Sequence, residues 1–170
     1  MKKNILIYPD NKDILLQKSE DIDINNIQTE EIQQLIQDLK DTLKSTTGVG
    51  ISAVQIGVLK RICIIKHNKQ EYVIINPKVT KTRGKIVSQE GCLSAPNTFT
   101  NITRAQKIWF DYYDETGRQK TADEGGLFSI IAQHEFDHFE GGCPVFDQVD
   151  KNEKDAEEIV KIIKKGDANE

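Results

Sequence analysis

The sequence contains no long hydrophobic run. Among its 170 residues, no apolar stretch approaches the roughly 18 residues that a membrane-spanning helix requires. The first twelve residues, MKKNILIYPDNK, hold a basic pair and the short apolar run ILIY but no small-residue cleavage site. This pattern predicts a first β-strand and not a signal peptide, so we expect no targeting segment and no contact with a membrane.

Cysteine and clustered basic charge are also scarce. Three cysteines are too few, and odd in number, for a disulfide scaffold, which favours a reducing, cytoplasmic setting. The net charge is −4 and the lysines are scattered, which argues against a nucleic-acid-binding protein. Hydrophobic residues make up 37% of the chain, as in an ordinary globular protein. We expect one domain over residues 1–170 with a frayed tail from about 166, because this length can bury a core without disulfides.

Periodic apolar residues predict three helices and a β region. The helices are expected over residues 30–44, after Thr29 as N-cap, over about 123–140 and over about 152–165. Between the first two helices lie the β-rich runs RICIIK (61–66), YVIINP (72–77), KIVSQ (85–89) and KIWFDYYDETG (107–117). Their turns are expected at His67-Asn68, Asn76-Pro77, Arg83-Gly84 and Thr116-Gly117. The middle of the chain is thus predicted to be mostly antiparallel β-structure.

Two of the three histidines lie four residues apart in AQHEFDHFEGG (132–142). On a helix, His134 and His138 point the same way, and a helix that is apolar nearly all round lies in the interior. Such imidazoles need a partner, because burying an unpaired polar group costs on the order of a few kcal/mol. Hydrogen-bonded core histidines are one interpretation. The motif His-Glu-x-x-His, with Glu135 inside the pair, favours a metal site instead.

A catalytic metal site of this kind needs a third protein ligand. An extended protease motif is excluded because Pro144 stands where its third histidine would be. His67 lies in an expected turn among lysines, and Cys63 lies in an apolar run, so neither is favoured. Cys92, in the loop EGCLSAP, is the preferred third ligand. Cys143, beyond the glycine pair that ends the helix, remains an alternative.

Three segments resemble the motifs of the peptide deformylase family. They are GVGISAVQ (48–55), EGCLS (90–94) and QHEFDH (133–138), in the family's order and spacing, with INPK before the cysteine and Arg104 after it. The resemblance implies an α+β fold of antiparallel β-sheets packed around a central metal-binding helix, with an N-terminal and a C-terminal helix. It also implies a metal-dependent hydrolase that removes the formyl group from the N-terminal formyl-methionine of new polypeptides. Its partners would be these nascent chains, with the ribosome as a place of encounter.

The resemblance assigns roles to residues of the three motifs. The metal ligands would be Cys92, His134 and His138. Glu135 would be the general acid/base, while Gln55 and the backbone N–H of Leu93 would stabilise the oxyanion. One divalent ion is implied, Fe²⁺ in cells, replaceable by Zn²⁺, Ni²⁺ or Co²⁺ because the ligand types suit all four. Glu90 and Arg104 would form an ion pair that braces the cysteine loop.

Substrate contacts are expected from two glycine-containing loops and from the metal-binding helix. Gly48 and Gly50 could be plain turn glycines, but in the family that this chain resembles such a loop runs beside the substrate backbone like an added strand. The resemblance also implies an apolar pocket for the methionine side chain. The substrate-binding candidates are Gly48, Val49, Gly50, Gly91, Leu127, Ile130 and Ile131. Ordinary core packing is an equal alternative for each apolar member of this set.

Three positions depart from the family pattern. Ser52 replaces the usual alanine and is expected to bond locally, Ile130 replaces an arginine, and the segment GGCPVFD after the second histidine is one residue longer. None of them is an expected ligand. Two other functions remain as alternatives, a deformylase-like metal-binding protein without activity and a metallopeptidase. Glu135 with Gln55 argues against the first, and an upstream cysteine ligand argues against the second.

Overall fold

The structure, a computed structural model, describes residues 1–167, and of the side chains those up to Lys161. The helices are α1 (Lys12–Leu15), the 3-10 helices η1 (Ile24–Asn26) and η2 (Ala53–Ile56), α2 (Glu30–Lys44), α3 (Gly126–Phe139) and α4 (Pro144–Asp167). The strands are β1 (Gly50–Ser52), β2 (Ile62–His67), β3 (Gln70–Arg83), β4 (Ile86–Cys92), β5 (Ala95–Arg104), β6 (Lys107–Tyr113) and β7 (Gln119–Gly125). Residues 168–170 of the predicted tail lie outside the described residues, whereas 166 and 167 belong to α4.

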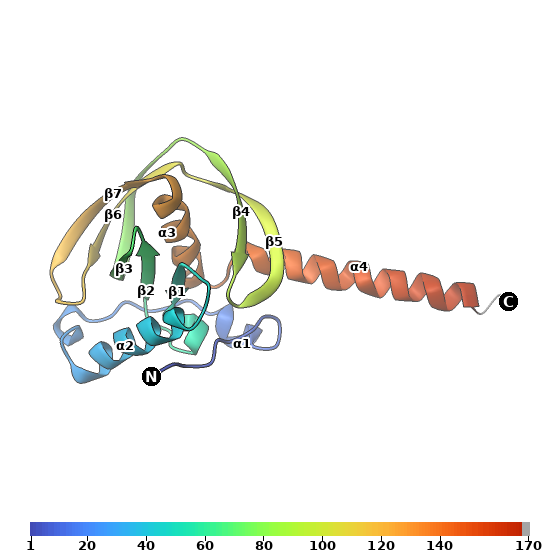
Figure 1. Cartoon of the computed structure of the whole chain (residues 1–170), viewed down its shortest axis with the longest axis horizontal. Coiled ribbons are helices and arrows are strands. Elements are labelled where there is room, and N and C mark those ends of the chain that lie inside the picture. Colours follow the sequence, from blue (N-terminus) through green and yellow to red (C-terminus); the bar gives the residue numbers. More distant parts are fainter. Residues whose placement is uncertain (168–170) are drawn as a thin grey trace.

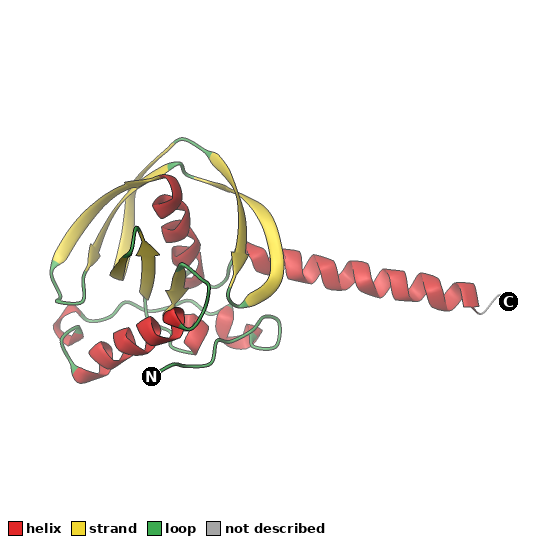
Figure 2. Cartoon of the chain, viewed as in Figure 1, coloured by secondary structure: helices red, strands yellow, loops and turns green. Residues whose placement is uncertain are grey.

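The strands form two sheets on either side of α3 (Figure 1). Five strands pair antiparallel in the order β1-β2-β3-β6-β7, and β4 pairs antiparallel with β5. Figure 2 shows how both sheets curve around the helix. The predicted α+β fold, with antiparallel sheets around a central helix and helices towards both ends, is confirmed.

The position of α3 in the interior follows from its sequence. Its buried side chains include Phe128, Ile131 and Phe139, which pack against Ile65 and Phe110 of the larger sheet. A helix with apolar groups on most sides must be covered on most sides, and the two sheets provide that cover. The two histidines are therefore carried into the centre of the molecule.

Two helix starts were predicted wrongly. The second helix begins at Gly126 and not at 123, because residues 119–125 pair with β6 as β7. The third begins at Pro144, eight residues before 152, since proline suits the first position of a helix and needs no hydrogen bond there. In Figure 1 this long helix, α4, extends away from the sheets. No helix in the described part of the chain is long and apolar enough to span a membrane.

The β predictions also needed corrections. The run ILIY is not a strand, although Leu6 N–H donates to the Gln55 carbonyl at 2.8 Å and Tyr8 N–H to the Ser94 carbonyl at 2.8 Å. The expected turn at Asn76 is instead an irregularity inside β3, where this residue has φ of 50°. Strands β1, β5 and β7 were not predicted, because their residues are too polar or too few to show an alternating pattern.

Candidate metal centre

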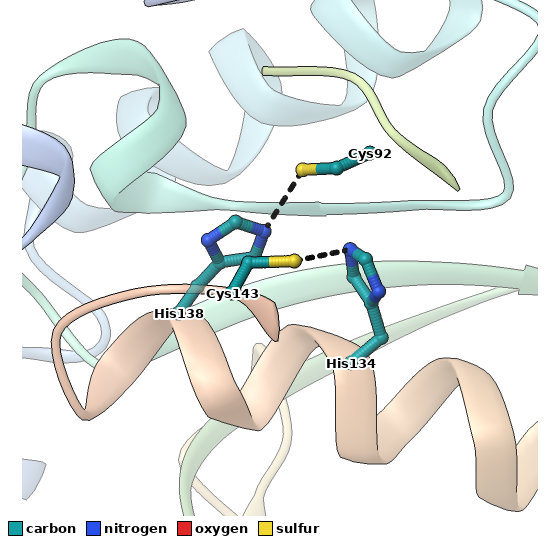
Figure 3. A group of neighbouring side chains, drawn as sticks. All are labelled: Cys92, His134, His138 and Cys143. Atoms are coloured by element: carbon teal, nitrogen blue, oxygen red, sulfur yellow. Dashed lines mark hydrogen bonds between the residues drawn. The ribbon is translucent and has the colours of Figure 1, made fainter. Parts of the chain in front are cut away.

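Four ligand-type atoms from three parts of the fold meet beside α3. One atom each from Cys92, His134, His138 and Cys143 lies within 4.8 Å of the other three. In Figure 3 the histidines project from α3, Cys143 lies close to them on the segment after this helix, and Cys92 faces them from the end of β4. His138 Nε2 lies 3.4 Å from Cys92 Sγ, and His134 Nε2 lies 3.8 Å from Cys143 Sγ.

The chemistry of this cluster fits a transition-metal ion. Two thiols and two imidazoles are the donors that zinc and neighbouring divalent ions take in proteins. Burial lowers the pKa of His138 to about 4, so its imidazole is neutral and has a lone pair for a cation. The neighbouring Cys92 sulfur and burial raise the pKa of the Cys143 thiol above its usual range. A coordinated thiol is nevertheless deprotonated by the ion itself.

A buried ion-pair network orients His134. Its Nδ1–H donates to Glu90 Oε1 at 3.0 Å, and Arg104 donates to both oxygens of Glu90, from Nη2 at 2.8 Å and from Nε at 2.9 Å. Burial alone would raise the pKa of Glu90, but hydrogen bonds from Arg104 and His134 lower it to about 2. Because Nδ1 is engaged, Nε2 is left to face the cluster. Asp137 accepts from Arg104 Nη1 at 2.6 Å, so it supports this network.

Glu135, the carboxylate between the histidines, is held in a fixed position. Its side chain is 3% exposed, and the Ser52 hydroxyl donates to Oε2 at 2.8 Å. Ser52 bonds locally as expected, in a capping box with Gln55, and its hydroxyl also reaches Glu135, 83 residues away. A Cβ atom on Gly50 would lie 2.9 Å from Cδ and 3.0 Å from Cγ of Glu135. Glycine at this position thus leaves room for the carboxylate.

The amide group of Gln55 is oriented by its surroundings. Gln55 lies on η2 and is 1% exposed. Its Oε1 accepts from the Ser52 backbone N–H at 2.9 Å, while Nε2 donates to Ser94 Oγ at 3.1 Å and lies 3.6 Å from Cys92 Sγ. Because the amide oxygen is already engaged with the backbone, the N–H₂ group is the end that faces the cluster.

A cavity of about 490 Å³ opens beside the cluster. Its walls include Gly48 and Val49 before β1, Gly50 of β1, Gln55 of η2, Gly91 and Cys92 of β4, Leu93 after it, and Leu127, Ile130, Ile131, His134 and Glu135 of α3. His138 and Cys143 do not line it. The structure therefore brings every substrate-binding candidate, both oxyanion candidates, Glu135 and two of the expected ligands to one cavity.

Comparison with known proteins identifies the family. The family described as polypeptide deformylase matches residues 2–155. The chain belongs to the polypeptide deformylase family. The resemblance drawn from the three motifs is thus confirmed.

Individual deformylases are similar along most of the chain. It is 44% identical over 117 residues to the peptide deformylase of Karelsulcia muelleri, covering 65% of this chain and 62% of that protein. It is 35% identical over 140 residues to that of Thermodesulfovibrio yellowstonii, covering 79% and 81%. A crystal structure of a peptide deformylase from Legionella pneumophila matches with a TM-score of 0.80 and 29% identity, covering 95% of this chain and 98% of that one. The chain is therefore a hydrolase enzyme, and nothing supports an inactive binding protein or a metallopeptidase.

Some residues around this cavity were not found from the sequence. Ser94, which accepts a hydrogen bond from Gln55, and Phe99, which lines the cavity, were overlooked. Cys143 was considered but not preferred, since the path of the chain after the glycine pair was unknown. Cys63 is fully buried in the core as expected, and His67 lies edge-on to Phe128 with ring centroids 5.6 Å apart, outside the cluster.

Proposed function

We propose that this cavity is the site at which the enzyme hydrolyses the formamide of N-terminal formyl-methionine. The observation that carries the proposal is that Cys92, His134, Glu135 and Gln55 line one cavity. Hydrolysis of a stable amide needs an activated water, a proton carrier and donors for the developing oxyanion. Cys92 and His134 can hold an ion that activates the water, Glu135 can carry the proton, and Gln55 can donate to the oxyanion.

We assign the binding of one divalent ion to Cys92, His134 and His138, whose ligand atoms lie within 4.8 Å of one another. An ion held there would lower the pKa of a bound water to about 7 and polarise the formyl carbonyl. We propose Fe²⁺ as the ion in cells, with Zn²⁺, Ni²⁺ and Co²⁺ as replacements, since thiolate and imidazole ligands accept all four. The three free cysteines agree with a reducing compartment, and we propose the cytoplasm.

Glu135 is the general acid/base of this mechanism. It takes a proton from the attacking water and returns it to the leaving amine. The hydrogen bond from Ser52 occupies Oε2, so Oε1 is the oxygen free to exchange the proton. Low exposure of the side chain keeps the proton from being lost to bulk solvent.

Gln55 and the backbone N–H of Leu93 stabilise the oxyanion. The amide of Gln55 presents its N–H₂ group because the Ser52 backbone already binds its oxygen. Leu93 follows Cys92 directly and lines the same cavity. A fixed donor of this kind typically contributes about 10²-fold or more to the rate.

The peptide backbone of the substrate pairs with the edge of the larger sheet. Among the described residues, strand β1 is an edge strand that pairs with β2, and it begins at Gly50 beside the cavity. An extended peptide can add to such an edge through main-chain hydrogen bonds. Glycines at 48, 50 and 91 line the cavity without side chains of their own, and the methionine side chain enters the apolar part lined by Val49, Leu127, Ile130 and Ile131. We propose nascent chains at the ribosome as the natural substrates.

The test is formate release from a formyl-methionyl peptide. Protein loaded with Ni²⁺ or Fe²⁺ is expected to release formate, and Glu135→Gln is expected to lose this activity while keeping the bound metal. The same peptide without the formyl group serves as control and should remain uncleaved. A fully loaded wild-type protein that releases no formate would refute the proposal.

A further inference from the structure

We propose that Cys143 is a fourth protein ligand, so that the ion is held by two thiolates and two imidazoles instead of one thiolate and two imidazoles. This inference takes one point from the proposed function, namely that Cys92, His134 and His138 bind the ion. It concerns a residue in the segment GGCPVFD, which follows directly after α3.

Two sulfur–nitrogen distances within the cluster match those of a four-ligand site. With metal–sulfur bonds of about 2.3 Å and metal–nitrogen bonds of about 2.0–2.1 Å, a tetrahedral arrangement places ligand atoms roughly 3.3–3.8 Å apart. Cys143 Sγ lies 3.8 Å from His134 Nε2, and Cys92 Sγ lies 3.4 Å from His138 Nε2. The four atoms form one set, with no pair further apart than 4.8 Å. By distance, Cys143 is as much a part of this set as Cys92.

The chain after α3 is built so that it returns to the histidines. Gly141 has φ of 96°, and a Cβ atom there would lie 2.6 Å from the Leu16 carbonyl oxygen, so only glycine fits. Pro144 then begins α4 directly after Cys143. The cysteine is thus held between a sharp turn and a helix start, and its side chain is 5% exposed beside Val145 and Phe146.

Cys63 serves for comparison, because it is a buried cysteine that does not belong to the ligand set. It is fully buried and packs in the cluster that includes Ile65 and Ile74, outside the set of four ligand-type atoms. The sulfur of Cys143, in contrast, lies beside the Nε2 atom of a histidine whose opposite nitrogen is fixed by Glu90. Ordinary packing requires no such neighbour.

A ligand at Cys143 is compatible with catalysis because it approaches from the buried side. Cys92 and His134 line the cavity, whereas Cys143 and His138 do not. An ion held by these residues would therefore face the cavity on the side of Cys92 and His134, and catalytic zinc sites are able to expand to five ligands. Two thiolates also balance the charge of a divalent ion. The enzyme is expected to retain its metal strongly and to prefer thiophilic ions.

The number of sulfur ligands can be measured directly. In the Co²⁺-substituted protein, each thiolate contributes a sulfur-to-cobalt charge-transfer absorption. Cys143→Ala is expected to halve this absorption and to lose the ion at least about tenfold faster to a chelator. The matched control is Cys63→Ala, which removes a buried thiol outside the cluster and should keep the full absorption. Equal absorption in the wild type and in Cys143→Ala would overturn the proposal.

X-ray absorption of the Zn²⁺-loaded wild type gives an answer that needs no folded variant. Two sulfur and two nitrogen neighbours would support the proposal, and one sulfur neighbour would overturn it. Formate release, measured on the same sample, tests the proposed function separately. A two-sulfur signal without formate release would refute the proposed function alone, and formate release with a one-sulfur signal would refute the role of Cys143 alone.

Discussion

Replacing Gly50 by alanine is expected to disable the enzyme without unfolding it. The added methyl group would lie 2.9 Å from Cδ and 3.0 Å from Cγ of Glu135, well inside the 3.5–4.0 Å at which carbon atoms are in favourable contact. The carboxylate cannot move away freely, because the Ser52 hydroxyl binds Oε2 at 2.8 Å and the side chain is 3% exposed. Either the hydrogen bond breaks or strand β1 shifts.

The expected losses of activity and stability in Gly50→Ala follow from the contact between the new methyl group and the Glu135 side chain. Loss of a general base typically costs about 10²–10⁴-fold in rate, so with Glu135 in its proposed role kcat should fall about 10²-fold or more. Overpacking a buried site costs about 1–3 kcal/mol, which lowers Tm by several degrees but leaves the protein folded at 25 °C. Because the backbone of residue 50 is retained, KM should change much less than kcat.

The assay is steady-state formate release at matched metal content, with thermal unfolding measured in parallel. Gly125→Ala is the control, because a Cβ atom there meets nothing closer than 3.7 Å, and it should keep the wild-type kcat. If Gly50→Ala also kept the wild-type kcat, the fixed position of Glu135 would not matter for the reaction.

Three further substitutions test other contacts. Ser52→Ala removes the hydrogen bond to Glu135, which contributes about 0.5–1.5 kcal/mol, and should lower kcat about two- to tenfold and Tm by a few degrees. Arg104→Ala leaves the buried Glu90 without its cation and should lower the free energy of unfolding, measured with urea, by about 3–5 kcal/mol. Burial alone would raise the pKa of Asp114, but hydrogen bonds from Thr116 and Arg118 lower it from its usual 3.8 to about 2. The stability from this shift is present above pH 4 and is lost as the pH falls towards 2, so Asp114→Asn should flatten that pH dependence by up to about 1 kcal/mol, after allowing for solvent screening.

Each of these expectations has a result that contradicts it. For Ser52→Ala it is an unchanged kcat, and for Arg104→Ala it is a stability within about 0.5 kcal/mol of the wild type. For Asp114→Asn it is an acid-unfolding curve parallel to that of the wild type between pH 4 and pH 2.

Short-range patterns predicted the part of the site that lies on a single helix. The four-residue spacing of His134 and His138 is set by helix geometry, and their burial follows from the apolar residues around them. Helix α2 was located within one residue because its apolar positions repeat over several turns. These features depend on neighbours in the sequence and need no knowledge of the tertiary structure.

Features that depend on tertiary pairing were missed. The residues of β7 are mostly polar and became a strand because β6 offers a full row of hydrogen-bonding partners. Likewise, two glycines mark a turn but not its direction, so the return of Cys143 to the histidines could not be predicted. The contact from Ser52 to Glu135 joins residues 83 apart, and no local pattern encodes such a distance.

The segment that failed to form a first strand has a consequence for how the enzyme can be shortened. Through Leu6 and Tyr8 it is joined to the backbone at Gln55 and at Ser94, and the Tyr8 ring stacks on Phe146 with centroids 4.4 Å apart. Removing the first eight residues would therefore remove the contacts that connect Gln55 with the first turn of α4. Because the removed residues belong to neither sheet, we expect the shortened enzyme to fold but to release formate more slowly than the full chain.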